Sequence, residues 1–539
     1  MIHPPARSSS RLLVAALVVL GLRAGPAAAD SYPRQTAVDV LHYDIAVELR
    51  EGSNLLAGTT RVRFEARQDG VDRLRLDLEG LTVDAVSAGG RPRPFRHESG
   101  RLEIELERPL ARGEIGAVEV LYHGRPEGGL LIGRNAHGRR VAFAENWPDH
   151  AHRWFPCLDH PYDKATADFA VMAPDRFEVV APGRQVETRA LLDGRRLTRW
   201  SQSVPIPTYC MVIGVAEFAV EPAGVVAGVP LSIWAYPQDR AAAARKFGRS
   251  ALVLQFLIDT IGPYPFEKLA QVQSTTRIGG MENASAIFYA ETAFQKEPVT
   301  ESPVPHEIAH QWFGDSVTPG DWDHLWVSEG FATYFDALFY ERLEGPSALK
   351  ARMARAVEPV KEFHRKHPAP VIDPDLADIP KKLNPFNYQK GAWVLHMLRR
   401  LLGDEPFFRG VHTYYRRHAG GNAVTEDVQR VMEAEGGTSL ATFFRQWFYQ
   451  PGFPEYRVTW RWDARNRQAE VAFEQAQAGG LFDTPVELAF AVGDAQERRT
   501  VRVAERRQTV RLDLPGRPSS LVLDPDGWLL HAATVSRGP

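Results

Sequence analysis

The stretch "VPHEIAHQWFGDSV", residues 304–317, places two histidines four residues apart and a glutamate directly after the first. On an α-helix, residues four apart lie on one face a turn from each other, so His306 and His310 can direct their imidazoles at one point. Imidazole is a good zinc ligand, and Glu307 could take a proton from a water molecule beside the metal. The same pattern also fits a surface helix on which two histidines align, so the stretch alone leaves both interpretations open.

A possible third ligand follows downstream. Eighteen residues separate His310 from Glu329, which opens a second helical pattern in "SEGFATYFD", residues 328–336. Two packed helices would bring this carboxylate to the imidazoles, and three protein ligands leave one position of a catalytic zinc open for water. Asp336 lies two turns further along the same helix face. We predict that it accepts an N–H bond from a ligand imidazole, with an exposed helix carboxylate as the alternative.

Composition narrows the class of protein. A chain of 539 residues is too long for one core and predicts two to four domains. Its 44% hydrophobic and 24% charged residues are typical of a soluble protein. The net charge of -3, without a long basic run, favours neither nucleic acid nor an anionic membrane surface as a partner. The two cysteines, Cys157 and Cys210, exclude a disulfide scaffold and could be either paired or buried free thiols.

The N-terminus has the pattern of an export signal. Arg7 and Arg11 precede the apolar run "LLVAALVVLGL", residues 12–22, and Ala27 and Ala29 form a small-residue cleavage site. The run is too short to cross a bilayer, although an uncleaved membrane anchor remains the alternative. We expect residues 1–29 to be a signal peptide, and the mature chain to be periplasmic or secreted, with no membrane association beyond export.

Residue patterning predicts a multidomain α+β protein. Apolar and polar residues alternate from about residue 41 to residue 218, as they do in half-buried strands. Apolar residues then follow helical spacing to about residue 450, and the turn "PGFP", residues 451–454, returns the chain to alternation. We predict an N-terminal β domain over residues 30–222, a mainly α domain carrying the histidines over residues 223–450, and a small β-sandwich over residues 451–534.

Four motifs together resemble one enzyme family. "HEIAHQWFGDSV" with "LWVSEGFATYFD", residues 325–336, resembles the signature of the zinc aminopeptidases (gluzincins) related to aminopeptidase N and the leukotriene hydrolase. "WFPCLDHPYDKATADF" (154–169), "GGMENASAIFY" (279–289) and "YQKGAWVLHML" (388–398) resemble further motifs of that family, in the family's order. The resemblance covers nearly all of residues 35–530. It implies a saddle-like N-terminal sheet domain, a thermolysin-like catalytic domain and one Zn²⁺ per chain.

The resemblance also implies roles for individual residues. It makes His306, His310 and Glu329 the zinc ligands, Glu307 the general base and Tyr388 the hydrogen-bond donor to the oxyanion. Glu282 would bind the free N-terminal ammonium of a peptide. The rest of its motif would contact the substrate chain: Gly279, Gly280, Met281 and Asn283. The expected protein is an aminopeptidase, monomeric by default, that removes the first residue from peptides with a free N-terminus.

The chain departs from the family pattern in three places. A second amine-binding residue is expected near position 147, where this chain has Trp147. Glu145 is a candidate for that role, with lining of the pocket for the first side chain as the alternative. The large C-terminal helical domain of many relatives is not expected here. Pro380 occupies the position at which the epoxide-opening relative needs an aspartate, so lipid epoxide hydrolysis is not expected.

Two other functions remain as alternatives. A thermolysin-like endopeptidase would use the same metal ligands, but would have no need of the amine-binding Glu282. A catalytically silent peptide-binding protein would not need every catalytic position to be filled. The preferred N-terminal side chain is left open, and we expect its pocket to involve residues around Ile278.

Overall fold

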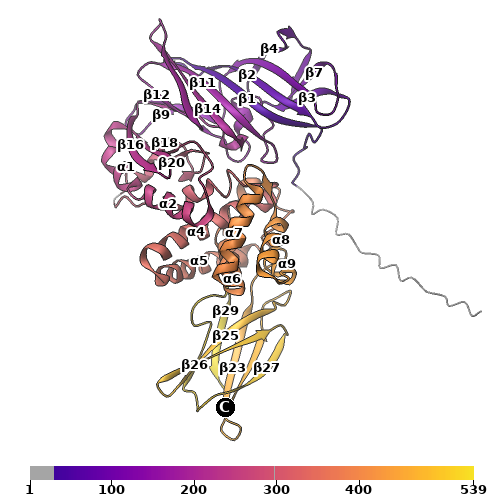
Figure 1. Ribbon diagram of the computed structural model, residues 1–539, viewed down its shortest axis with the longest axis vertical. Coiled ribbons are helices and arrows are strands. Elements are labelled where there is room, and N and C mark those ends of the chain that lie inside the picture. Colours follow the sequence, from indigo (N-terminus) through magenta and orange to yellow (C-terminus); the bar gives the residue numbers. More distant parts are fainter. Residues whose placement is uncertain (1–29, 297, 539) are drawn as a thin grey trace, which may run out of the picture.

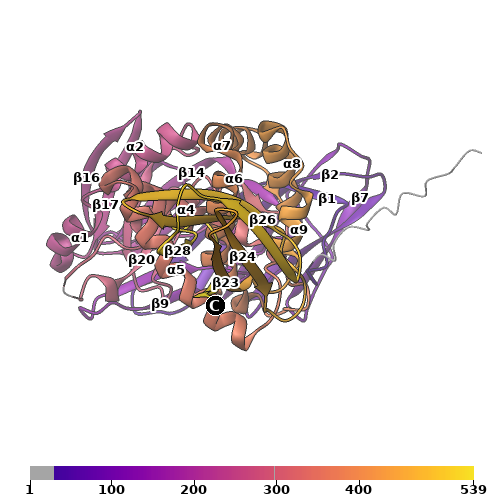
Figure 2. The ribbon, with the colours of Figure 1, turned by 90° about the horizontal axis from the view of Figure 1, so that it is seen from below.

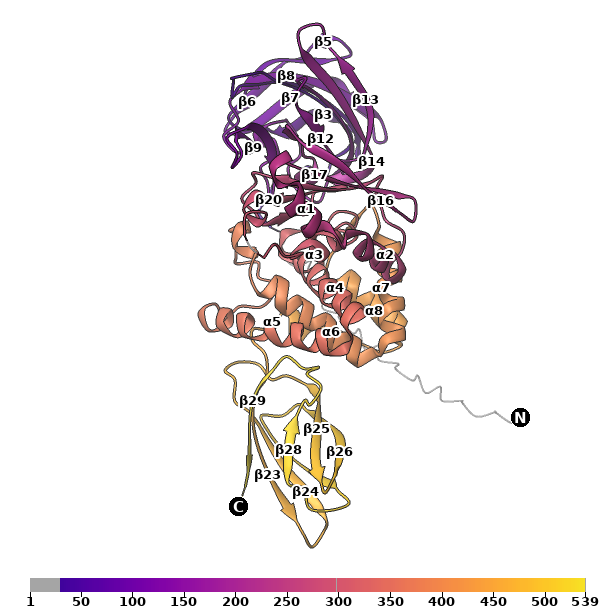
Figure 3. The same cartoon turned by 90° about the vertical axis from the view of Figure 1, so that its left-hand side faces the viewer.

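The computed structural model describes residues 30–296 and 298–538, so the predicted signal peptide lies outside the described residues. The chain forms three parts along its longest axis: sheets at one end, helices in the middle and further sheets at the other end (Figure 1). Figure 3 shows the same order from the side. None of the described helices is long and apolar enough to cross a membrane.

The N-terminal part is built from three sheets. The largest has eight strands in the order β13-β14-β11-β1-β2-β8-β4-β5, and smaller sheets run β12-β15-β10-β9 and β3-β7-β6. In β1 and β11 buried and more exposed residues alternate, because successive side chains point to opposite faces of a strand. The strands are β1 (Val38–Leu49), β2 (Leu56–Ala66), β3 (Val71–Asp77), β4 (Thr82–Ala88), β5 (Arg91–Pro92), β6 (Phe95–Glu98), β7 (Arg101–Leu110), β8 (Ile115–Gly124), β9 (Gly129–Arg134), β10 (Arg140–Glu145), β11 (Lys164–Pro174), β12 (Glu178–Val180), β13 (Arg184–Ala190), β14 (Arg195–Pro207) and β15 (Gly214–Ala216).

A five-stranded sheet leads into the helical part, in the order β16-β17-β18-β20-β19. Its strands are β16 (Ala219–Val226), β17 (Val229–Ala235), β18 (Leu269–Ser274), β19 (Gly280–Met281) and β20 (Ala286–Ala290). All residues of β18 and β20 are buried, as expected for central strands covered on both faces. The short strands β21 (Thr318–Pro319) and β22 (Asn422–Ala423) pair separately.

The helical part has its own apolar core, which includes Trp312, Phe313, Phe331 and Tyr414. Helix α4 runs through this core, and thirteen of its nineteen residues are buried. The helices are α1 (Arg240–Phe247), α2 (Ser250–Ile261), α3 (Val304–His310), α4 (Trp326–Glu344), α5 (Pro346–Lys366), α6 (Gly391–Leu402), α7 (Asp404–His418), α8 (Thr425–Gly436) and α9 (Ala441–Phe448). Short 3₁₀ turns include η5 (Trp322–His324) and η6 (Ile379–Lys382), and η7 (Phe386–Lys390) is a π-helical turn.

The C-terminal part is a small pair of sheets with a separate core. One sheet has the order β27-β24-β23-β29 and the other β26-β25-β28. Seen from below, these sheets lie over the helices of the middle part (Figure 2). Their strands are β23 (Glu455–Asp463), β24 (Gln468–Gln475), β25 (Thr484–Val492), β26 (Ala495–Val503), β27 (Arg507–Asp513), β28 (Ser520–Leu523) and β29 (Ala532–Arg537).

The predicted fold class is confirmed: β, then mainly α, then β. The sheets of residues 455–537 are the last elements of the described chain. The residue numbers predicted for the domain boundaries stay predictions. Of the two interpretations of the cysteines, buried free thiols is the correct one, since Cys157 and Cys210 are both buried and unpaired.

Candidate metal centre

Helices α3 and α4 bring three ligand atoms together. Nε2 of His306 lies 2.9 Å from Nε2 of His310. Oε2 of Glu329 lies 3.3 Å from each of these two nitrogens. The helix α3 is only seven residues long, but that is enough to place both imidazoles on one face a turn apart. Glu329 is in the first turn of α4, which packs against α3.

This set of atoms fits a zinc ion. A tetrahedral ion with bonds of about 2.0–2.1 Å has ligand atoms roughly 3.3–3.4 Å apart, close to the separations found here. Oε2 of Glu329 is buried and has no hydrogen-bond partner among the described residues, so a cation would compensate its burial. Burial lowers the pKa of His306, and the neighbouring His310 lowers it further, which favours the neutral imidazole that a metal requires.

The second nitrogen of His310 is held by groups that the sequence did not reveal. Nδ1 lies 2.9 Å from the Phe313 carbonyl oxygen and 3.0 Å from the Ser328 hydroxyl. Donation to this carbonyl fixes the tautomer and leaves Nε2 free to bind a metal. Asp336, predicted for this role, instead accepts a bond from Arg352 at 3.0 Å. Seven residues carry it about 10 Å along the helix axis from Glu329, too far to reach the imidazoles.

Glu307 points into the same cavity as the candidate ligands. Its side chain is buried, and burial raises its pKa well above the usual range, as suits a general base that must also release its proton. Gly280 faces this carboxylate: a Cβ atom at position 280 would collide with Glu307. The glycine therefore allows strand β19 to pass directly beside the acid.

Glu282 lies next to this strand, with its carboxylate in the same cavity. Ligand atoms of Glu282, Glu307 and His310 all lie within 4.8 Å of one another. Burial raises the pKa of Glu282, and no ion-pair partner for it exists among the described residues. Gly280 and Met281 line the cavity with it, whereas Gly279 and Asn283 do not. The Asn283 amide lies 3.5 Å from the Met281 carbonyl oxygen of its own loop.

Tyr388 also lines this cavity and lies on the π-helical turn η7 before α6. Its ring stacks on His306, with centroids 5.9 Å apart and planes 11° from parallel. Burial raises the pKa of its hydroxyl well above the usual range, so it stays a neutral donor. The tyrosine is therefore placed beside the candidate metal without adding a charge.

The structure places Trp147 and Glu145 differently from the prediction. Trp147 lines the cavity and packs edge-on against Trp322, with ring centroids 5.7 Å apart. Glu145 does not line the cavity: its Oε1 accepts hydrogen bonds from the backbone nitrogens of Arg277 at 2.5 Å and Ile278 at 3.4 Å. The substrate-binding role predicted for Glu145 is therefore replaced by a contact that holds the loop before Gly279.

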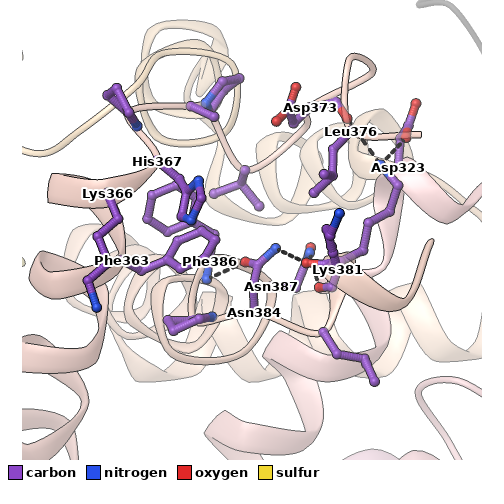
Figure 4. A pocket seen from close by; sticks show the side chains of 17 residues that line it. Asp323, Phe363, Lys366, His367, Asp373, Leu376, Lys381, Asn384, Phe386 and Asn387 are labelled. Carbon is purple, nitrogen blue, oxygen red and sulfur yellow. Dashed lines mark hydrogen bonds and ion pairs between the residues drawn. The ribbon is translucent and has the colours of Figure 1, made fainter. Parts of the chain in front are cut away.

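The cavity at the centre has a volume of about 30 Å³, enough for a water molecule. Its remaining lining is apolar and includes Ile278 and Leu383. Leu383 also lines a larger neighbouring cavity of about 450 Å³ (Figure 4). In that cavity the rings of Phe363, His367 and Phe386 gather on one side, and Lys382 pairs with Asp323 at 2.6 Å on another.

Comparisons with known proteins agree with this geometry. The profile of the "Peptidase family M1 domain" matches residues 248–447, and that of the "Peptidase M1 N-terminal domain" matches residues 40–210. The chain belongs to peptidase family M1. The first match contains all the residues that line the metal centre from α3, α4 and η7. Zinc is accordingly the cofactor of this centre.

Family M1 relatives include several enzymes whose names state an activity. Glutamyl aminopeptidase of Rattus norvegicus is 27% identical over 456 residues, which are 78% of this chain and 48% of that protein. A probable aminopeptidase 1 of Saccharolobus solfataricus is 27% identical over 448 residues, 76% of this chain and 53% of that protein. The chain thus spans about half the length of the curated relatives it matches.

One solved structure of an M1 enzyme is matched over nearly its whole length. The crystal structure of the M1 zinc metallopeptidase from Deinococcus radiodurans aligns with a TM-score of 0.69 and 28% identity, covering 78% of this chain and 95% of that chain. A structure of a mutant of the same enzyme, bound to a Tyr-Ser-Ala substrate, aligns equally well, with a TM-score of 0.69.

Proposed function

We propose that this M1 family member is a zinc aminopeptidase that hydrolyses the first peptide bond of peptides with a free N-terminus. The observation that carries the proposal is the Glu282 carboxylate, buried beside the candidate metal and without an ion-pair partner in the described chain. A buried carboxylate is costly unless it is paired, and an N-terminal ammonium is the charge that would compensate it. The tripeptide in the related Deinococcus radiodurans structure supports a peptide substrate.

The mechanism follows from the positions of four side chains. Zinc held by His306, His310 and Glu329 would supply a Lewis acid and lower the pKa of water. Glu307 takes the proton of the attacking water and delivers it to the leaving nitrogen. The Tyr388 hydroxyl donates a hydrogen bond to the carbonyl oxygen as negative charge develops there.

Glu282 determines which bond is cut. By binding the ammonium, it places the first peptide bond, and no later bond, beside Glu307. This contact makes the protein an exopeptidase, whereas a thermolysin-like endopeptidase would need no free amine. We further propose that the enzyme acts outside the cytoplasm as a monomer, in keeping with the export signal expected in residues 1–29.

The test combines turnover with zinc content in four proteins. Wild type, Glu307→Gln, Glu282→Ala and Asp336→Asn are assayed on an aminoacyl fluorogenic amide and on its N-acetylated form. Glu307→Gln should keep one zinc per chain and lose turnover by about 10²–10⁴-fold, since it removes the general base. Glu282→Ala should keep zinc and lose most of kcat/KM on the free amine.

Asp336→Asn is the matched control, a carboxylate on α4, the helix that carries Glu329, but away from the cavity. It should leave zinc content and turnover near wild type. Equal cleavage of the acetylated substrate by wild type would indicate an endopeptidase, and zinc binding without any turnover would indicate a silent binding protein. Full activity of Glu282→Ala on the free amine would refute the proposal.

A further inference from the structure

Gln311, the residue directly after His310, connects the metal-binding helix to the loop that carries Glu282. Its side chain is fully buried. Nε2 donates to the Glu282 carbonyl oxygen at 2.6 Å and to Asp315 Oδ2 at 2.8 Å. Oε1 accepts from the Ser285 backbone nitrogen at 2.7 Å, with the Tyr264 hydroxyl 3.0 Å away. The two donors and the acceptor of this amide are thus all engaged.

Two of these bonds fall on one short turn, residues 282–285, between β19 and β20. Ser285 adopts a φ of 61°, in the left-handed region that a residue with a side chain rarely occupies without support. The bond from its N–H to Gln311 supplies such support. The bond to the Glu282 carbonyl holds the other end of the same turn. One amide therefore fixes both ends of the turn whose first residue carries the carboxylate.

We propose that Gln311 is a positioning residue, which sets the distance between the Glu282 carboxylate and the metal and so makes the enzyme depend on a free amine. The inference rests on the proposed function of Glu282. Gln311 and His310 are adjacent in the chain. The hydrogen bonds of Gln311 therefore fix the position of the turn that carries Glu282 relative to a metal ligand. Loss of the amide should loosen the turn and leave the three ligands in place.

The test measures binding of two hydroxamates that share a metal-binding group, L-leucine hydroxamate and 4-methylpentanoyl hydroxamate, which lacks the α-amino group. The ratio of their dissociation constants reports the amine contact alone. In Gln311→Met, which keeps the side-chain volume, this ratio should fall at least tenfold, while zinc stays at one per chain. Hydrogen exchange of the Ser285 amide should become faster, a readout that does not depend on turnover.

Two controls separate positioning from a general loss of structure. Tyr264→Phe removes a contact to the same Oε1 without touching the turn, and should leave the ratio near wild type. In a Glu282→Gln background, Gln311→Met should change the ratio little further, because both changes act through one carboxylate. If Gln311→Met does not fold, Gln311→Glu serves instead, since it loses both donated bonds at nearly constant size.

The outcomes also distinguish this inference from the function on which it rests. A wild type that binds both hydroxamates equally contradicts amine binding by Glu282, and with it the proposed function. A large ratio in wild type that persists in folded, zinc-loaded Gln311→Met, or in Gln311→Glu, overturns the positioning role alone. Effects that add fully in the double variant overturn it as well.

Discussion

Side chains of two opposite kinds line the candidate site. Three carboxylates, Glu282, Glu307 and Glu329, face the cavity. Apart from Gly280, Tyr388 and the two histidines, the rest of the lining is apolar and comes from four residues: Trp147, Ile278, Met281 and Leu383. The carboxylates suit a cation and an ammonium, and the apolar side chains are left to contact the side chain of the first residue of a peptide.

This lining predicts a preference for apolar N-terminal residues. A glutamyl or aspartyl side chain would bring another negative charge beside three buried carboxylates, which is unfavourable at short range. We expect kcat/KM for leucyl and methionyl amides to exceed that for glutamyl amides by at least about tenfold. The glutamyl side chain loses apolar contact and adds repulsion, which together cost from about one to a few kcal/mol. A panel of aminoacyl fluorogenic amides measures this. A glutamyl amide as the best substrate, as the names of several relatives state for those enzymes, would contradict the expectation.

Spacing along a helix made the metal ligands predictable, because it alone decides which side chains share a face. His306 and His310 needed one turn of helix, and Glu329 needed the second helix to pack against the first. The sequence did not predict the groups whose position depends on tertiary contacts. The Phe313 carbonyl has no side-chain signal at all, and Glu145 is turned away from the cavity by the backbone of a loop more than a hundred residues distant.

At the scale of elements, two helical segments touch backbone to backbone beside the site. A Cβ atom on Gly391 would lie 2.9 Å from the Gly330 Cα atom, and one on Gly330 would lie 3.0 Å from Gly391. Gly330 directly follows Glu329 on α4, and Gly391 follows three residues after Tyr388. The close approach of α4 to the start of α6 is therefore what brings the tyrosine hydroxyl near the third ligand.

Gly391→Ala should force these segments apart, because the atoms it meets are backbone and cannot rotate away. Overpacking of this kind costs about 1–3 kcal/mol, so the melting temperature should fall by several degrees. Turnover should fall further than zinc content, since Tyr388 moves while the ligands on α3 do not. Thermal melts, zinc analysis and steady-state kinetics measure the three effects.

The matched control is Gly133→Ala in β9, where a Cβ atom would meet nothing within 4 Å. It should leave all three quantities near wild type. Wild-type turnover and melting temperature in Gly391→Ala would show that the helices can separate at no cost. The sequence predicted the helices themselves from their apolar periodicity, but not this contact or the π-helical turn at Tyr388, because neither leaves a periodic signal.

At the scale of the whole molecule, three buried amino groups join the parts of the chain. Nζ of Lys164, on β11, lies 2.7–3.2 Å from the carbonyl oxygens of residues 315, 316 and 421 in the helical part. Lys268 reaches back to the Ala181 carbonyl at 2.8 Å. Lys390 reaches the Gly452 carbonyl at 2.9 Å, in the turn that leads to the C-terminal sheets. Burial lowers the pKa of each to about 7.

Because burial lowers the pKa of these lysines, the free energy of unfolding depends on pH, and the sign of this dependence can be derived. Lys390 is the best lysine for the test because its side chain is fully buried. Its pKa is about 7 in the folded chain and has the ordinary value of 10.5 when unfolded. Between these values the unfolded chain binds more protons, so the free energy of unfolding rises with pH. Relative to Lys390→Met, which cannot titrate, wild type should therefore gain stability from pH 7 to pH 9.5.

Thermal or denaturant melts of both proteins across this range measure the difference. Lys366→Met is the matched control, since the Lys366 side chain is mostly exposed to solvent, unlike that of Lys390. Its difference from wild type should stay flat from pH 7 to pH 9.5. A flat difference for Lys390→Met would show that the folded protein keeps this lysine charged without penalty, by admitting water to the junction between the helices and the C-terminal sheets.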